Sequence, residues 1–166
     1  SDADGAKKFY TSLFGWTVND MPMGDSGGTY TFWEKNGKGV GAMYELMADQ
    51  RQQGIPPNWG QYIAVDDADA AAEKAKQLGG NVVAGPFDVY DSGRMAMVID
   101  PTGAAFGLWQ AKQHIGATVA NEPNSFTWNE LLTPDTKKAK EFYTSLFGWT
   151  AKETPGYTEW HSGAEA

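Results

Sequence analysis

The stretch FYTSLFGWT occurs twice in this chain, letter for letter, at residues 9–17 and 142–150. Nine identical residues with two Phe, a Tyr and a Trp do not recur by chance, and such self-similarity is the signature of repeated structural units. The apolar residues around the first copy follow the spacing of one face of a helix: Ala6, Phe9, Tyr10, Leu13 and Phe14. We therefore predict the same amphipathic helix twice, each copy ended by a glycine.

A third predicted helix has the same spacing between an aspartate at its start and a glycine after its end. Asp2, Asp67 and Asp135 are each followed thirteen residues later by a glycine, and each aspartate suits a helix N-cap. Around the middle helix, residues 59–110 predict the order strand, helix, strand, strand, strand. The chain is thus predicted to contain βαβββ modules of roughly sixty-odd residues, one nearly whole, one whole and one cut short.

This repeat predicts an α+β fold of paired βαβββ modules, and it also predicts where the domains begin and end. We place one domain at residues 1–112, with modules at 1–47 and 57–112, a linker at 113–124, and the opening part of a second domain at 125–166. The first module begins at its helix, so its opening strand lies outside the chain. We hypothesise that residues 125–133, the equivalent strand of the third module, occupy that position within the chain or by exchange in a homodimer.

Composition narrows the function classes. The net charge is −8, which argues against a nucleic-acid partner, since that would need clustered Lys and Arg. No apolar run approaches the ~20 residues of a membrane span. The chain has no Cys, so it has no disulfide framework, which fits a cytoplasmic location.

Three motifs make the chain similar to a known superfamily: residues 6–16 (AKKFY followed by LFGW), residues 62–67 (YIAVDD) and residues 100–103 (DPTG). Paired βαβββ modules with these motifs resemble the vicinal oxygen chelate superfamily of glyoxalase, bleomycin-resistance and extradiol dioxygenase proteins. The resemblance implies a half-barrel of two curved sheets around a cavity. It also implies, for the enzymes, a divalent metal held by His or Glu on the first and last strands of each module.

Carried onto this chain, the resemblance places those ligand positions at four residues: Gly41, Gly60, Gly107 and Trp128. A catalytic Zn²⁺ or Fe²⁺ needs about three N or O side-chain ligands, and glycine offers none. We therefore expect no metal and no cofactor, and whether the chain is an enzyme stays open.

Strand alternation suggests which side chains share the cavity with those glycines. The candidates for binding a ligand are Met43, Glu45, Tyr62, Trp109, Trp128 and Glu130. A cavity with Trp, Tyr and Met and one or two acids suits a flat apolar ligand. The alternative, equally weighted, is that these side chains only fill space in a core.

Other candidate chemistry is better explained structurally. His114 and His161 are isolated, and the acidic run 66–69 stands where a helix begins. The sequence leaves three functions: a metal-free domain that binds a small apolar or aromatic molecule, which we favour; a metal-dependent lyase, isomerase or dioxygenase; or a structural module that works through oligomerisation.

Overall fold

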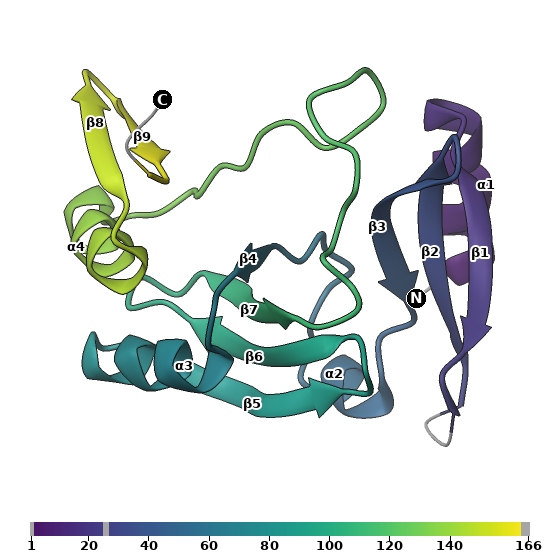
Figure 1. Ribbon diagram of the computed structural model, residues 1–166, viewed down its shortest axis with the longest axis horizontal. Helices are drawn as coiled ribbons and strands as arrows, with labels where there is room; N and C mark the ends of the chain where they lie inside the picture. The colour runs from purple at the N-terminus through teal and green to yellow at the C-terminus, as the bar shows by residue number, and fades with distance from the viewer. Residues whose placement is uncertain (1, 25–26, 164–166) are drawn as a thin grey trace. The chain divides into compact units, whose positions relative to one another are not determined.

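The computed structural model describes residues 2–24 and 27–163, and the chain divides into two compact units (Figure 1). Unit one comprises Ser1–Trp59 and Ile115–Asn129, and unit two comprises Gly60–His114 and Glu130–Ala166. Helices and strands are both present, so the predicted α+β class is confirmed. Within the described ranges, no helix is long and apolar enough to cross a membrane.

Unit one holds a helix followed by an antiparallel sheet of order β1-β2-β3. Its elements are α1 (Ala3–Phe14), β1 (Thr17–Pro22), β2 (Thr29–Lys35), β3 (Lys38–Tyr44) and the short α2 (Ala48–Gln52). The Asp2 carboxylate accepts a hydrogen bond of 2.8 Å from the Gly5 N–H, which caps α1. Gly15 ends the helix with φ of 68°, a left-handed conformation that glycine adopts without strain.

Unit two contains the complete βαβββ module that the sequence predicts. Its elements are β4 (Tyr62–Ala64), α3 (Ala68–Gln77), β5 (Asn81–Val89), β6 (Gly93–Ile99) and β7 (Ala105–Ala111). The sheet order is β4-β7-β6-β5, with β4 parallel to β7 and the other pairs antiparallel (Figure 1). The first strand therefore lies beside the last.

The third module contributes α4 (Thr136–Phe147), β8 (Thr150–Thr154) and β9 (Tyr157–His161) to unit two. Four side chains of α4 are buried: Ala139, Phe142, Tyr143 and Leu146. They pack in one core with α3 and the β6–β7 pair, whose buried members include Ala75, Val98 and Leu108. The helix of one module thus completes the core of another.

The strand predicted at residues 125–133 does not form. In that range the structure has only an isolated parallel bridge between Phe126 and Ala120, and the Phe126 carbonyl accepts a hydrogen bond of 2.7 Å from the Asn121 N–H. A strand needs a neighbour along its length, and β8 and β9 pair with each other instead. The proposed occupation of the missing first-strand position within the chain is therefore not observed, while exchange between two chains stays a prediction.

Part of the predicted linker is packed. Val119 is buried with Trp16, Trp33 and Val40 in the core of unit one. The Thr118 N–H also donates a hydrogen bond of 2.8 Å to the Gly39 carbonyl on β3. Apolar burial, which a polarity pattern alone does not reveal, holds this segment to the sheet.

Candidate functional site: aromatic rings over glycines

In unit two, the ring of Tyr62 lies over Gly107. The two residues are paired across the parallel strands β4 and β7. A Cβ added at Gly107 would lie 2.3 Å from Cδ1 of Tyr62, so the ring occupies the space that a side chain at Gly107 would need. The resemblance placed a metal ligand at Gly107, and an aromatic ring stands there instead.

Trp109 makes a second such contact on the same sheet. A Cβ added at Gly93 would lie 2.4 Å from Cζ2 of Trp109, so the indole covers that glycine. The indole N–H donates a hydrogen bond of 2.8 Å to the His114 carbonyl. The rings of Tyr62 and Trp109 meet edge to face at 6.3 Å, a favourable arrangement for aromatic pairs.

These rings belong to one face of the sheet of unit two, which we call the methionine face. Its residues alternate with the core residues Ala96, Val98 and Leu108 along the strands. The methionine face consists of Tyr62, Phe87, Met95, Met97 and Trp109. Tyr62 is 51% exposed and Phe87 45% exposed, so large apolar surface is accessible there.

Unit one has a similar contact between an aromatic ring and a glycine. It involves Trp59, which was not among the residues predicted from the sequence. A Cβ added at Gly41 on β3 would lie 3.5 Å from Cζ3 of Trp59, and the indole N–H of Trp59 donates to the Tyr10 hydroxyl at 3.1 Å. The sequence predicted a strand from residue 59 onward. The strand begins only at Tyr62, so alternation did not apply to Trp59.

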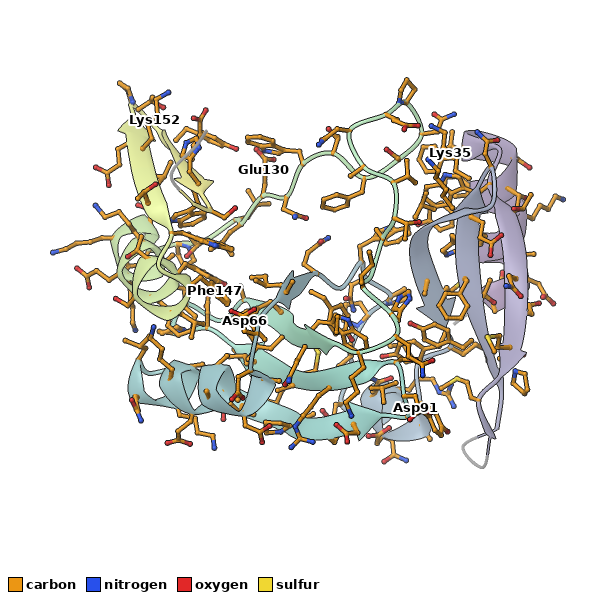
Figure 2. The ribbon with its side chains drawn as sticks, viewed as in Figure 1. Lys35, Asp66, Asp91, Glu130, Phe147 and Lys152 are labelled. Atoms are coloured by element: carbon orange, nitrogen blue, oxygen red, sulfur yellow. The ribbon has the colours of Figure 1, made fainter. Side chains whose placement is uncertain are left out.

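The remaining predicted residues are distributed over both units. In unit one, Met43 packs against the core around Trp33, Trp128 is 61% exposed, and Glu45 lies beyond the end of β3. In unit two, Gly60 is exposed. Glu130, which is labelled in Figure 2, accepts a hydrogen bond of 3.0 Å from the Tyr157 hydroxyl. Among the six predicted ligand-binding residues, Tyr62 and Trp109 are in ring contact with each other.

Glu45 lines a hollow of unit one that has mixed polarity. The hollow measures about 330 Å³, and its wall contains Met23, Glu45, Leu46, Met47 and Arg51 together with glycine, Thr and Ala residues. One acid and one base there lie among apolar side chains.

The acidic run at the start of α3 has a structural explanation. Asp67 accepts a hydrogen bond of 2.9 Å from the Ala70 N–H and so caps the helix. Asp69 binds Arg94 through two hydrogen bonds of 2.5 and 2.9 Å, and Arg94 also contacts Asp88 at 3.2 Å. The hydrogen bond from Arg94 lowers the pKa of Asp69, and those from Lys112 and Arg94 lower the pKa of Asp88.

Over residues 2–24 and 27–163, no three His, Asp or Glu side chains gather in a way that could hold a metal ion. His161 lies 3.7 Å from Glu159, and its Nε2 has no hydrogen-bond partner among the residues that the structure describes. His114 stands beside Trp109, with the two rings 6.1 Å apart. The four family ligand positions offer no oxygen or imidazole donor, so the residues present do not fit a metal of the kind that the resemblance implies.

The chain is 49% identical over 150 residues to "Putative glyoxylase CFP32" of Mycobacterium tuberculosis, covering 90% of this chain and 57% of that protein. It is 37% identical over 176 residues to "Anthracycline biosynthesis protein DnrV" of Streptomyces peucetius, covering 98% of this chain and 64% of the relative. The chain thus spans less than two thirds of the length of these curated relatives.

Among solved structures, methylmalonyl-CoA epimerase from Mycobacterium tuberculosis matches with 17% identity and a TM-score of 0.47, over 66% of this chain and 80% of that one. A family model described as Glyoxalase/Bleomycin resistance protein/Dioxygenase superfamily matches residues 1–108. The chain belongs to the Glyoxalase/Bleomycin resistance protein/Dioxygenase superfamily.

Proposed function

We propose that this chain binds a planar, apolar or aromatic small molecule on the methionine face of unit two, without a metal. The observation that carries the proposal is the ring of Tyr62 over Gly107. A side chain that could ligate a metal has no room at that position while the ring is there. The ring itself is half-exposed and offers a stacking surface.

The neighbouring side chains suit such a ligand. Met95 and Met97 on β6 are paired with Trp109 and Gly107 of β7, so two methionine side chains share the face with the two rings. Methionine is flexible and polarisable, and it makes favourable contacts with aromatic rings. Tyr62 and Phe87 are about half-exposed and the other three residues are partly buried, so the face gains free energy when a flat molecule covers it.

Charge supports a neutral or cationic ligand over an anionic one. The chain has 21 acidic and 13 basic residues. Arg94 and Lys112, two bases of unit two, are paired with Asp69 and Asp88. A planar cation would also gain from the faces of Tyr62 and Trp109.

One relative points in the same direction. The name of the Streptomyces peucetius protein connects it with anthracycline biosynthesis. Anthracyclines contain fused planar rings and an amino sugar, the shape and charge that the methionine face favours.

The test is a binding titration of the purified chain with the anthracycline doxorubicin, followed by tryptophan fluorescence and by the melting temperature. We expect saturable binding, and stabilisation that grows with ligand concentration as binding to the native state requires. Tyr62→Ala should weaken binding at least several-fold. Tyr90→Ala is the matched control, because Tyr90 is a 79% exposed tyrosine of the same unit outside the methionine face.

Equal losses in both variants would show that Tyr62 is not part of a site, and the absence of saturable binding of this probe would reject the anthracycline-like ligand class. Both variants should keep the melting temperature of the unliganded chain within a few degrees, so that a loss of binding is not a loss of fold.

A second candidate is a metal-dependent enzyme of the superfamily, and the name of the mycobacterial relative favours it. Metal analysis of protein purified without chelators separates the two functions. A stoichiometric divalent metal would overturn the metal-free proposal, and its loss on Tyr157→Phe or Glu130→Gln would point to the bonded pair in unit two as its neighbourhood.

A further inference from the structure

The helices α1 and α4 share the sequence FYTSLF and pack in the same way against their own modules. In α1, Tyr10 stacks on Phe14 at 6.2 Å, and Phe14 lies 4.7 Å from Trp16. In α4, Tyr143 stacks on Phe147 at 6.3 Å, and Phe147 lies 4.7 Å from Trp149. The Tyr and Phe of each helix therefore make the same ring contacts within their own module.

The second faces of the two helices differ completely. Phe142 and Leu146 of α4 are 2% and 5% exposed. Their counterparts in α1, Phe9 and Leu13, are 57% and 54% exposed. Identical residues at identical helix positions are thus buried in one copy and exposed in the other.

The surface that covers α4 is formed by small residues of α3 and by the glycine after it. Phe142 and Leu146 share a core with Ala72 and Ala75 of α3. At the end of α3, a Cβ added at Gly80 would lie 3.2 Å from the ring of Phe142, so a small residue is favoured there.

A cation completes the contact. Nζ of Lys74 on α3 donates a hydrogen bond of 3.1 Å to the Leu146 carbonyl in the last turn of α4. The surface that covers α4 is therefore a helix with small residues at two successive turns, a glycine at its end and a lysine that reaches the carbonyl of the partner helix.

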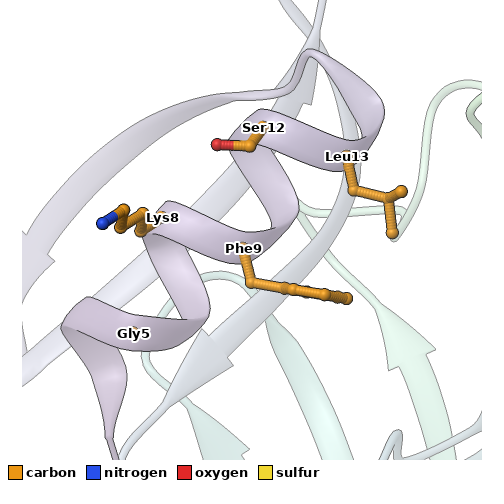
Figure 3. A pocket seen from close by; sticks show the side chains of 5 residues that line it. All are labelled: Gly5, Lys8, Phe9, Ser12 and Leu13. Carbon is orange, nitrogen blue, oxygen red and sulfur yellow. The ribbon is translucent and has the colours of Figure 1, made fainter.

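The corresponding face of α1 is open. A shallow hollow of about 500 Å³ lies there, lined by Gly5, Lys8, Phe9, Ser12 and Leu13. Figure 3 shows the side chains of Phe9 and Leu13 on the same side of the helix. Phe9 and Leu13 are four residues apart on one helix face and form one exposed apolar patch, the kind of surface that marks interaction sites.

We propose that the Phe9–Leu13 face of α1 is a docking site for a helix of the α3 type, carried by a further βαβββ module of a longer protein. The α3 helix of a second copy does not meet this requirement, because its own α4 covers it. The mycobacterial relative extends well beyond the matched residues, since the match covers only 57% of it, which leaves room for another module. The helix of the further module would cover α1 as α3 covers α4.

Hydroxyl-radical footprinting read by mass spectrometry tests this proposal, with α4 as the internal reference. In the 166-residue chain, we expect Phe9 and Leu13 to be oxidised several-fold faster than Phe142 and Leu146 at every protein concentration. In the full-length Mycobacterium tuberculosis relative, the residues aligned with Phe9 and Leu13 should be as protected as those aligned with Phe142 and Leu146.

Two footprinting results would overturn the proposal. One is unchanged fast oxidation at the aligned α1 positions of the full-length relative. The other is protection of Phe9 that grows with the concentration of the 166-residue chain, which would identify a second copy as the occupant. A photoreactive phenylalanine at the position aligned with Phe9 should crosslink to a helix outside the matched 150 residues. Crosslinks confined to the matched residues would also reject the assignment.

Discussion

The Tyr143 hydroxyl donates a hydrogen bond of 2.9 Å to Oδ2 of Asp100, and both side chains are buried. This bond joins α4 to the DPTG hairpin of the preceding module. The other carboxylate oxygen of Asp100 accepts from the Thr102 N–H, the Thr102 hydroxyl and the Ala104 N–H, at 2.7, 2.8 and 3.0 Å. Burial alone would raise the pKa of Asp100, but these hydrogen bonds together outweigh it and lower that pKa.

The lowered pKa of Asp100 predicts a pH dependence. A carboxyl whose folded-state pKa lies below its ordinary value of 3.8 stabilises the fold above that value. The contribution is lost as the pH falls through the folded-state pKa. Urea unfolding should therefore show a free energy of unfolding that decreases below about pH 4, and Asp100→Asn should flatten this part of the curve. A curve that keeps the wild-type slope in Asp100→Asn would contradict the assignment.

Removing the hydroxyl of Tyr143 should cost more than removing that of its counterpart in α1. Tyr143→Phe leaves a buried carboxylate with one donor fewer, and hydrogen bonds to charged groups contribute about 1.5–3 kcal/mol. Tyr10→Phe is the matched control, because its hydroxyl accepts only a partly exposed indole N–H from Trp59, and we expect a loss of about 0.5–1.5 kcal/mol. Chemical denaturation at pH 7 measures both values, and equal losses would show that Asp100 does not depend on Tyr143.

The two copies of the helix allow the same substitution in two environments. Phe142→Ala empties a site in the core of unit two and should lower the free energy of unfolding by about 3–5 kcal/mol. Phe9→Ala changes an exposed side chain and should cost less than about 0.5 kcal/mol in the 166-residue chain. Comparable losses from the two variants would mean that the Phe9 face is already covered.

Gly107 and Gly41, two of the three glycines under aromatic rings, should respond differently to a methyl group. Gly107→Ala places a Cβ 2.3 Å from Cδ1 of Tyr62, and the required shift should cost about 1–3 kcal/mol. Gly41→Ala meets Trp59 at 3.5 Å, an ordinary contact, and should be tolerated. Combining Gly107→Ala with Tyr62→Ala should recover most of the loss, and additive effects of these two changes would show that the ring is not the obstacle.

The cap of α3 supplies a test within the acidic run. Asp67→Ala removes the acceptor of the Ala70 N–H and should cost about 1 kcal/mol. Asp66→Ala, one residue earlier, is the control, and we expect a change within about 0.5 kcal/mol. Thermal unfolding of the two variants distinguishes a capping role from a general charge effect.

Much of the local structure could be predicted from the sequence because its signals are local. The side chains of Asp2, Asp67 and Asp135 each accept a hydrogen bond from the N–H three residues on, as expected of N-caps. The pairing of Tyr62 with Gly107 also followed the predicted alternation. Trp59 was missed because alternation holds only inside a strand, and that residue precedes one.

Residues 125–133 show the opposite case. Their composition suits a strand, but a strand forms only where a partner edge pairs with it, and the structure pairs these residues only through the bridge of Phe126 to Ala120. Local propensity therefore predicted a strand that the structure does not contain.

The sequence by itself determined the repeated helix, its caps, the order of the βαβββ module and the glycines at the superfamily's ligand positions. Only the tertiary structure decided that Phe142 is buried while Phe9 is exposed, although both occupy the same place in the same nine residues. Helix formation depends on the chain's own backbone hydrogen bonds and spacing, which the sequence carries. Burial depends on which other surface arrives: within unit two, α3 covers the Phe142 face of α4, whereas the Phe9 face of α1 in unit one is exposed.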